Sequence, residues 1–160
     1  MPDKKNTIEE IQVVMFSLGN EEFAARTNQI KEITKMIEIT KMPKAPSFIE
    51  GVINLRGQVI AVIDLAKQLD LPTSERGEET RNMVVDMDGN IVGMIVDTVT
   101  EVLKISTENI DPTPPLIESR VDTRYIEGIG KLEDRLFVLL DLKKVLSLEE
   151  IESVEKTTGS

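Results

Sequence analysis

Short apolar runs separated by turn residues follow one another along most of the chain. "VVMFSL" and "EEFAAR" flank Gly19-Asn20, while "NMVVDM" and "IVGMIV" flank Asp88-Gly89-Asn90. Pairs of such runs joined by residues that tolerate positive φ predict β-hairpins. Two further runs, "QVIAVIDL" and "RLFVLLDL", are apolar at nearly every position and predict strands that are buried on both faces.

The same pattern occurs twice. Residues 15–36 align without gaps on residues 84–105, and residues 49–69 align on residues 126–146. The second copy is longer, and we expect its extra residues in the loop "DPTPPLIESRVD". Two successive sets of short, hairpin-linked strands predict an all-β protein made of two similar small barrels with pseudo-twofold symmetry.

Helix signals are confined to short segments. Asp64 and Asp141 each follow an apolar strand and can cap a short helix. "SLEEIESVEK" predicts a terminal helix, because Ser147 and Glu150 have the spacing of a capping box. The last residues, "KTTGS", are expected to fray.

Composition narrows the functions that such a fold can serve. The chain has 40% hydrophobic and 30% charged residues, a formal charge of −10, and neither Cys nor His. That charge disfavours nucleic acid and anionic membrane surfaces as partners. Without Cys or His we expect no disulfide, no catalytic triad and no metal or other cofactor. The start, "MPDKKNTIEE", lacks the apolar stretch of a signal peptide, so we expect a cytoplasmic protein without direct membrane insertion.

Three local features have competing interpretations. "DMDGN" resembles the start of a calcium loop, but its glycine falls too early, so a hairpin turn is favoured. Gly51 and Gly128 recur at equivalent positions and indicate tight backbone geometry. Arg56 differs, because the second copy has Glu133 there and a residue required by the barrel should not tolerate reversed charge. Arg56 is therefore either a solvated residue beside a hairpin tip or a partner-binding residue.

The segment "PSFIEGVINLRGQVIAVIDLAKQL", with "NQIKEIT" before it and "VGMIVDTVTEVLKI" after it, resembles the CheW family of chemotaxis coupling proteins. The similarity covers about residues 12–146. It implies two five-stranded SH3-like barrels, with a short C-terminal helix, in a noncatalytic adaptor. Such an adaptor couples methyl-accepting chemoreceptors to the histidine kinase CheA in signalling arrays at the inner face of the membrane. The receiver-fused coupling protein CheV shares the fold, but no receiver, kinase or dimerisation segment is recognised here.

The resemblance also implies the binding residues. Receptor contacts are expected at Ile30, Glu32, Arg56 and Val99, and the kinase-contacting surface near Ile39, Gly51 and Gly57. For Ile30 and Val99 the residues alone favour core packing, with an exposed interface as the alternative. The second copy has "KLED" where the first has "NLRG", so one arginine-bearing site is expected.

On this interpretation residues 12–146 form a single domain of two lobes, one barrel at about 13–72 and the other at about 82–146, followed by a helix and tail at 147–160. Three alternatives remain. One is a small-molecule sensor with its ligand between the barrels, and another is a CheV-like regulatory module without its receiver. The third is an enzyme that uses Asp or Glu as acid and base. Few polar groups in the apolar strands disfavour the sensor, and the lack of paired carboxylates within apolar segments disfavours the enzyme.

Overall fold

Strands make up most of the chain, as the apolar runs predict. A computed structural model describes residues 9–112 and 123–158, so most of the expected insertion "DPTPPLIESRVD" lies outside the described residues. The strands are β1 (Glu10–Leu18), β2 (Glu21–Arg26), β3 (Ile30–Lys35), β4 (Ile49–Leu55), β5 (Gln58–Asp64), β6 (Arg81–Met87), β7 (Asn90–Val96), β8 (Thr98–Ser106), β9 (Ile110–Asp111), β10 (Ile126–Leu132) and β11 (Arg135–Leu140).

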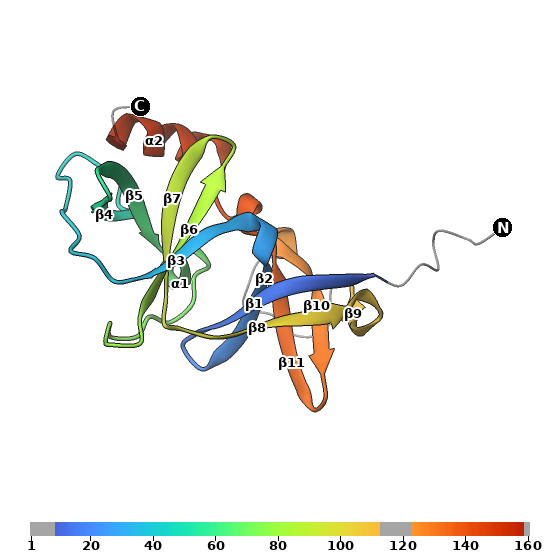
Figure 1. Cartoon of the computed structure of the whole chain (residues 1–160). Coiled ribbons are helices and arrows are strands. Elements are labelled where there is room, and N and C mark those ends of the chain that lie inside the picture. Colours follow the sequence, from blue (N-terminus) through green and yellow to red (C-terminus); the bar gives the residue numbers. More distant parts are fainter. Residues whose placement is uncertain (1–8, 113–122, 159–160) are drawn as a thin grey trace.

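These strands form two sheets that lie side by side (Figure 1). One has six strands in the order β8-β1-β2-β11-β10-β9, and the other has five in the order β3-β6-β7-β5-β4. Apart from β9, each strand of one sheet has its repeat mate at the same place in the other. The prediction of two similar small barrels related by an internal repeat is confirmed.

Each sheet, however, takes strands from both copies of the repeat. Hairpin β1–β2 joins β8, β10 and β11, while hairpin β6–β7 joins β3, β4 and β5. The pairing is symmetric, because Ile30 lies opposite Val85 in one sheet and Val99 lies opposite Phe16 in the other. The expected division into barrels at about 13–72 and about 82–146 therefore does not describe the sheets. A repeat identifies equivalent strands but not their partners, since equivalent hairpins offer the same backbone donors and acceptors.

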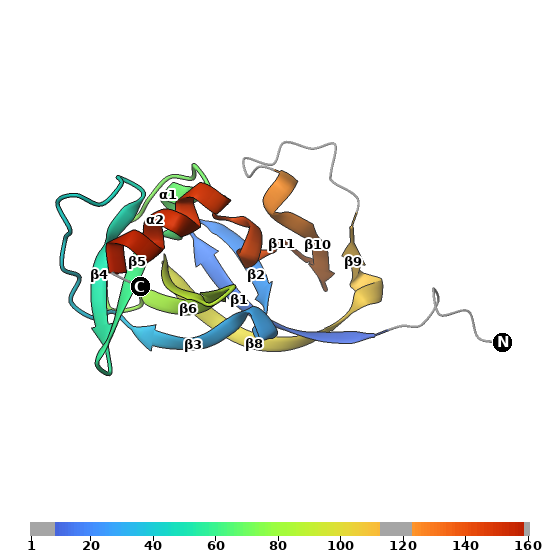
Figure 2. The same cartoon turned by 90° about the horizontal axis from the view of Figure 1, so that it is seen from above.

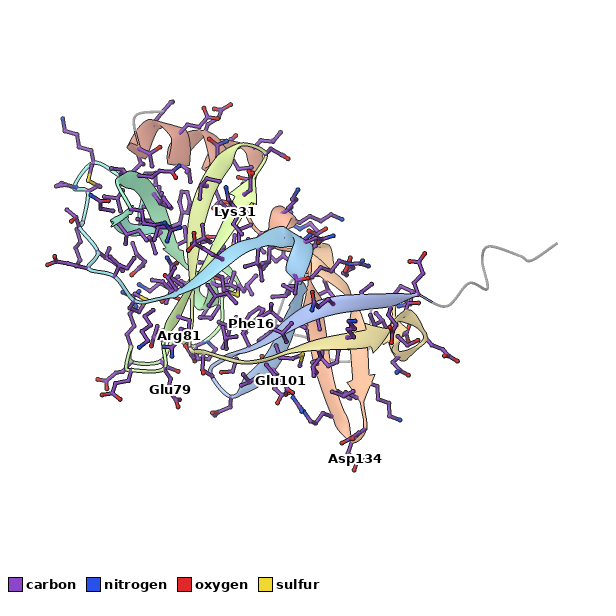
Figure 3. All side chains as sticks on the ribbon, viewed as in Figure 1. Phe16, Lys31, Glu79, Arg81, Glu101 and Asp134 are labelled. Atoms are coloured by element: carbon purple, nitrogen blue, oxygen red, sulfur yellow. The ribbon has the colours of Figure 1, made fainter. Side chains whose placement is uncertain are left out.

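Three hydrophobic clusters fill the molecule. One lies within the six-stranded sheet and includes Met15 and Phe137, and another lies within the five-stranded sheet and includes Ile60 and Val84. The largest, which we call the shared core, combines buried residues of both sheets, among them Phe16. Figure 3 shows Phe16 where the two sheets meet. Because the shared core needs both sheets, the two barrels form one folding unit.

The hairpin turns and helix caps follow the local signals. At "DMDGN", Asp88 and Gly89 have φ of 55° and 97°, and the Gly89 N–H donates to Asp86 Oδ1 at 2.7 Å. This geometry confirms a hairpin turn between β6 and β7. The side chains of Asp64 and Asp141 also accept capping hydrogen bonds, at the starts of α1 (Leu65–Gln68) and the 3-10 turn η5 (Leu142–Lys144).

Helix α2 (Leu148–Thr158) lies across the five-stranded sheet (Figure 2). Its predicted capping box is confirmed: the Ser147 N–H donates to Glu150 Oε1 at 2.8 Å, and the Glu150 N–H donates to Ser147 Oγ at 3.1 Å. The expectation of fraying from residue 156 is wrong for residues 156–158, which are helical. The Thr157 hydroxyl donates to the carbonyl one turn back at 2.8 Å, and Val154 anchors the helix in the shared core. Within residues 9–112 and 123–158, no helix combines the length and apolar character needed to cross a membrane.

Candidate functional site

Arg56 lies at the tip of the β4–β5 hairpin. Arg56 and Gly57 have φ of 52° and 89°, in the left-handed region that a tight hairpin turn requires. The Gly57 N–H donates to Asn54 Oδ1 at 2.7 Å and closes the turn. At the equivalent tip, Glu133 has φ of 56°. The tip therefore accepts either charge at this position, and the fold itself does not require the Arg56 guanidinium.

The Arg56 side chain forms an ion pair with Glu32, on the edge strand β3. The side chain of Arg56 is 69% exposed and that of Glu32 is 31% exposed, so the guanidinium remains accessible at the surface. The hydrogen bond and charge of Glu32 raise the pKa of Arg56 above its ordinary value. Two of the expected receptor-contacting residues thus meet where the edge strand β3 approaches the tip of the β4–β5 hairpin, which comes from the opposite edge of the five-stranded sheet.

The other two expected receptor-contacting residues are partly buried and pack against the shared core. Ile30 begins β3, two residues before Glu32, whereas Val99 lies on β8 in the other sheet. Ile30 also borders a polar cavity of about 370 Å³ with Lys31, Asp86 and Lys143. The structure therefore places Ile30 on the same strand as Glu32 and places Val99 at the pseudosymmetric position.

The residues expected near the kinase surface do not form one exposed patch. Gly51 is buried with φ of 155°, and a Cβ there would lie 2.6 Å from Ile39 Cγ2 and against the Thr40 carbonyl oxygen. Thr40 pairs with Val52 by two backbone hydrogen bonds of 2.8 and 2.9 Å, so close approach explains the glycine. Gly57 is exposed at the hairpin tip.

The sequence interpretation missed a second arginine cluster. Arg135, two residues after Glu133, forms ion pairs with Glu22 at 3.0 Å and with Glu101 at 3.4 Å. Its partners raise the pKa of Arg135, Glu22 more than Glu101. Glu101 is the repeat mate of Glu32, so each sheet pairs this glutamate with an arginine from the neighbouring hairpin. Figure 3 labels Glu101 on β8 and Asp134 at the tip of the β10–β11 hairpin. The recurring glutamate was a signal that could have pointed to Arg135.

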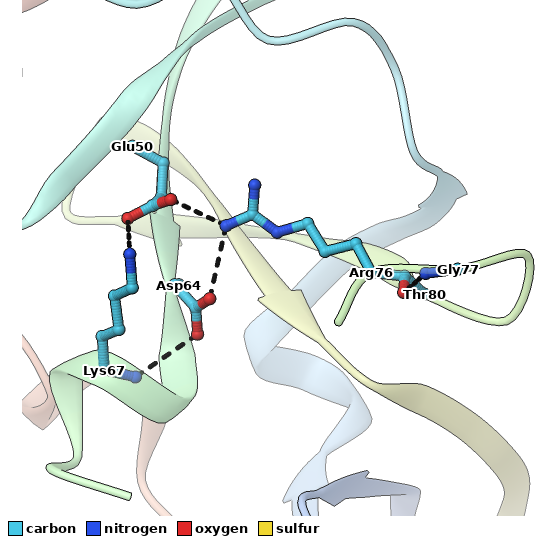
Figure 4. A network of polar contacts seen from close by, with 6 residues as sticks. All are labelled: Glu50, Asp64, Lys67, Arg76, Gly77 and Thr80. Carbon is cyan, nitrogen blue, oxygen red and sulfur yellow. Dashed lines mark hydrogen bonds and ion pairs between the residues drawn. The ribbon is translucent and has the colours of Figure 1, made fainter. Parts of the chain in front are cut away.

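A third polar cluster ties the connector between the two copies to the end of β5 (Figure 4). Arg76 contacts Glu50 at 2.7 Å and Asp64 at 3.3 Å, and Lys67 contacts Glu50 at 2.9 Å. Burial alone would raise the pKa of Glu50, but the hydrogen bonds and charges of Lys67 and Arg76 outweigh it and lower that pKa. This network holds the polar connector against the strand that carries Gly51. Among the described residues, no group of three or more Asp or Glu side chains gathers as a metal site would.

Comparison with known proteins gives the family. The CheW-like domain family matches residues 12–150, most of the chain. The chain belongs to the CheW family. It is 34% identical to the chemotaxis protein CheW of Klebsiella aerogenes over 149 residues, which cover 93% of this chain and 89% of that protein. It is 36% identical to the CheW of Bacillus subtilis over 142 residues, covering 89% of this chain and 90% of that protein.

A solved structure shares the CheW fold as well as the sequence. The scaffolding protein TtCheW of Thermoanaerobacter tengcongensis superposes with a TM-score of 0.79 at 35% identity, covering 89% of this chain and 96% of that one. The resemblance noted from "EGVINLRG" and its flanking segments is thus confirmed over both sheets.

Proposed function

We propose that this chain is a noncatalytic chemotaxis adaptor that holds chemoreceptors and a CheA-type histidine kinase together. The observation that carries this proposal is the match of the CheW-like domain family to residues 12–150, together with the similarity of the whole fold to a scaffolding protein. The adaptor would work in the cytoplasm, recruited to receptor arrays at the inner face of the membrane. It would need no cofactor, because its function is to present two surfaces at a fixed geometry.

The receptor surface would be the part of the five-stranded sheet around Arg56, Glu32 and Ile30, where β3 approaches the β4–β5 hairpin tip. Arg56 supplies an accessible guanidinium, Glu32 orients it, and Ile30 supplies adjacent apolar area. Val99 would extend this surface to the second sheet, across the shared core. An arginine that is held in place but exposed is well suited to bind a carboxylate of a partner, since its planar group makes directed hydrogen bonds.

The kinase surface would lie on the same sheet around Ile39, and Gly57, at the hairpin tip next to Arg56, would border both surfaces. Gly51 would act on it indirectly, because any side chain there would displace Ile39 and Thr40. The shared core supports residues 12–146 acting as one domain, since a shift in either barrel would be felt in the other.

Charge exchange between Arg56 and Glu32 tests the receptor surface. Arg56→Glu alone should fold normally, because Glu133 adopts the same backbone conformation, and should weaken receptor binding more than tenfold. Adding Glu32→Arg restores an ion pair in which the two charges have exchanged positions. The double variant should regain any stability that Arg56→Glu loses, but it should not regain receptor binding. Glu133→Arg, at the equivalent tip, is the matched control and should change neither property.

The measurements are a melting curve and pull-down of each variant with a CheA-type kinase and with a receptor signalling fragment. Kinase binding should persist in Arg56→Glu. If the wild-type chain captured neither protein, the adaptor proposal would be wrong. If Glu133→Arg weakened receptor capture as much as Arg56→Glu did, the assignment of the surface would be wrong.

A further inference from the structure

A groove lies between helix α2 and the loop that joins β3 to β4. It has a volume of about 570 Å³ and is lined by loop residues 42–46 and by Ser153, Lys156 and Thr157 of the helix. Figure 1 shows this loop and the C-terminal end of α2 on the same side of the five-stranded sheet. None of the residues expected to contact receptor or kinase lines this loop–helix groove. The proposed function therefore leaves it without a role.

The loop wall of the groove is already shaped. The Met42 carbonyl accepts a hydrogen bond from the Ala45 N–H at 3.0 Å, and the Pro46 carbonyl accepts one from the Ile49 N–H at 3.0 Å. These are two consecutive turns, and Pro43 and Pro46 restrict the backbone further. Ala45 packs against the shared core and anchors the loop. Little conformational entropy would be lost when a ligand settles in the groove.

The opposite wall is equally fixed, because Ile151 and Val154 hold α2 on the shared core. Ser153 donates its hydroxyl hydrogen to the Glu149 carbonyl at 3.2 Å, and Thr157 donates to the Ser153 carbonyl at 2.8 Å. Both hydroxyl hydrogens are therefore already used. The donors left for a ligand on the helix side belong to Lys156.

Two lysines with no partner flank an otherwise apolar surface. Lys44 and Lys156 are exposed, and within the described residues neither makes a hydrogen bond or an ion pair. Between them lie Met42, whose side chain remains 39% exposed, and the proline rings of the loop. Lys44 and Lys156 are the charged residues that line the groove, in a chain with a formal charge of −10.

We propose that the loop–helix groove binds an acidic peptide segment of a partner protein. One or two apolar side chains of the segment would lie on Met42 and the loop prolines, while its carboxylates would pair with Lys44 and Lys156. Charge complementarity favours an acidic segment, because a basic or neutral one would leave both ammonium groups unpaired. The groove is also large enough for two or three side chains rather than a whole helix.

A peptide titration of the full chain tests this proposal. The probe is an acetylated and amidated peptide, Glu-Glu-Leu-Leu-Glu-Glu, followed through the amide NMR signals of isotope-labelled protein. The amide signals of Met42, Lys44, Ala45 and residues 153–157 should shift, and affinity should fall with rising salt. Peptides with Ser in place of Leu, or Lys in place of Glu, should bind at least tenfold more weakly.

Matched variants locate the site. Lys44→Glu with Lys156→Glu should weaken binding of the probe at least tenfold. Lys104→Glu with Lys131→Glu changes the net charge equally on exposed positions of the other sheet and should leave binding unchanged. Melting curves check that both double variants remain folded. The double variant Lys44→Gln with Lys156→Gln, which removes the two charges without reversing them, should also weaken binding of the probe.

Four results would overturn the proposal. They are absence of shifts at the groove up to several millimolar probe, equal binding of the Ser-substituted peptide, equal loss in the control pair, and binding of octanoate but not of peptide. The last result would make the groove a site for aliphatic anions. Sedimentation of the free chain must show that a second copy does not occupy the groove. These outcomes do not depend on binding of kinase or receptor, so the adaptor proposal is tested separately.

Discussion

Asn82 is a polar residue buried where the fold does not require one. It is 2% exposed on β6, and neither its Oδ1 nor its Nδ2 has a hydrogen-bond partner among the described residues. In the register of the repeat its mate is Val13, which is fully buried in the six-stranded sheet. An unpartnered buried amide costs about 1–3 kcal/mol. We therefore predict that Asn82→Val raises the free energy of unfolding by about this amount.

Gly93 allows a second test of this prediction, because its Cα faces the side-chain amide of Asn82. A Cβ on Gly93 would lie 2.5 Å from Asn82 Oδ1 and 2.9 Å from Nδ2, and its repeat mate is Ala24. Gly93→Ala alone should destabilise the protein by about 1–3 kcal/mol through overpacking. In the Asn82→Val background the same change should be nearly neutral, because the six-stranded sheet already combines Val13 with Ala24.

Urea unfolding of the wild type, the two single variants and the double variant measures the interaction energy between positions 82 and 93. Residues in contact show interaction energies of about 0.5–3 kcal/mol in such cycles, and here the sign should favour the double variant. For a chain of this size each kcal/mol corresponds to about 2–4 °C in Tm, so melting curves give an independent check. Destabilisation by Asn82→Val, or strict additivity of the two changes, would refute the reasoning. Destabilisation would mean that the amide has a hydrogen-bond partner such as a buried water, and additivity would mean that a Cβ at position 93 does not press on the residue at position 82.

Further predictions concern the polar contacts that tie distant segments together. Arg76→Ala should lower the free energy of unfolding by about 1 kcal/mol, measured in urea, since the pair with Glu50 is partly exposed. The pKa of Glu50 is lowered in the folded state, so its contribution to stability is present above its ordinary value of 4.5 and is lost as the pH falls below it. Between pH 6 and 3, the free energy of unfolding should therefore fall less steeply with decreasing pH for Arg76→Ala than for the wild type. Gln29→Ala removes hydrogen bonds of 2.8 Å to Asp141 and 2.9 Å from the Leu142 N–H, and should speed hydrogen exchange of that amide. Unchanged exchange at Leu142 would contradict the role given to Gln29.

Local signals predicted the local structure. The hairpin turn at Asp88 and the caps at Asp64, Asp141 and Ser147 each depend on residues within a few positions, and all four are present. Such features follow from side-chain chemistry and backbone preferences near each turn. The internal repeat extended the prediction to two similar barrels, and the family resemblance extended it to the adaptor class.

Contacts between distant segments were not predictable in the same way. The ion pair of Arg135 with Glu22 joins residues 113 positions apart, and nothing near either residue indicates the other. The pairing of β1 with β8 was missed for the same reason, since an apolar strand fits several neighbours equally well. The Arg56–Glu32 pair spans 24 positions and depends on how far β3 lies from the hairpin tip. The family resemblance assigned both residues to one receptor-contacting surface, but nothing in the sequence predicted that their side chains contact each other.

The exchange of hairpins between the copies implies a history and a mechanical property for this chain. A precursor with a single copy of the repeat could have completed such a sheet only as a symmetric dimer, in which each subunit gave its first hairpin to the other. Duplication joins those subunits by the connector at residues 72–80, and a bimolecular encounter becomes an intramolecular one at high effective concentration. Cleavage of that connector should therefore leave two fragments that are unfolded apart and associate on mixing. An adaptor built this way cannot release one barrel while the other stays intact.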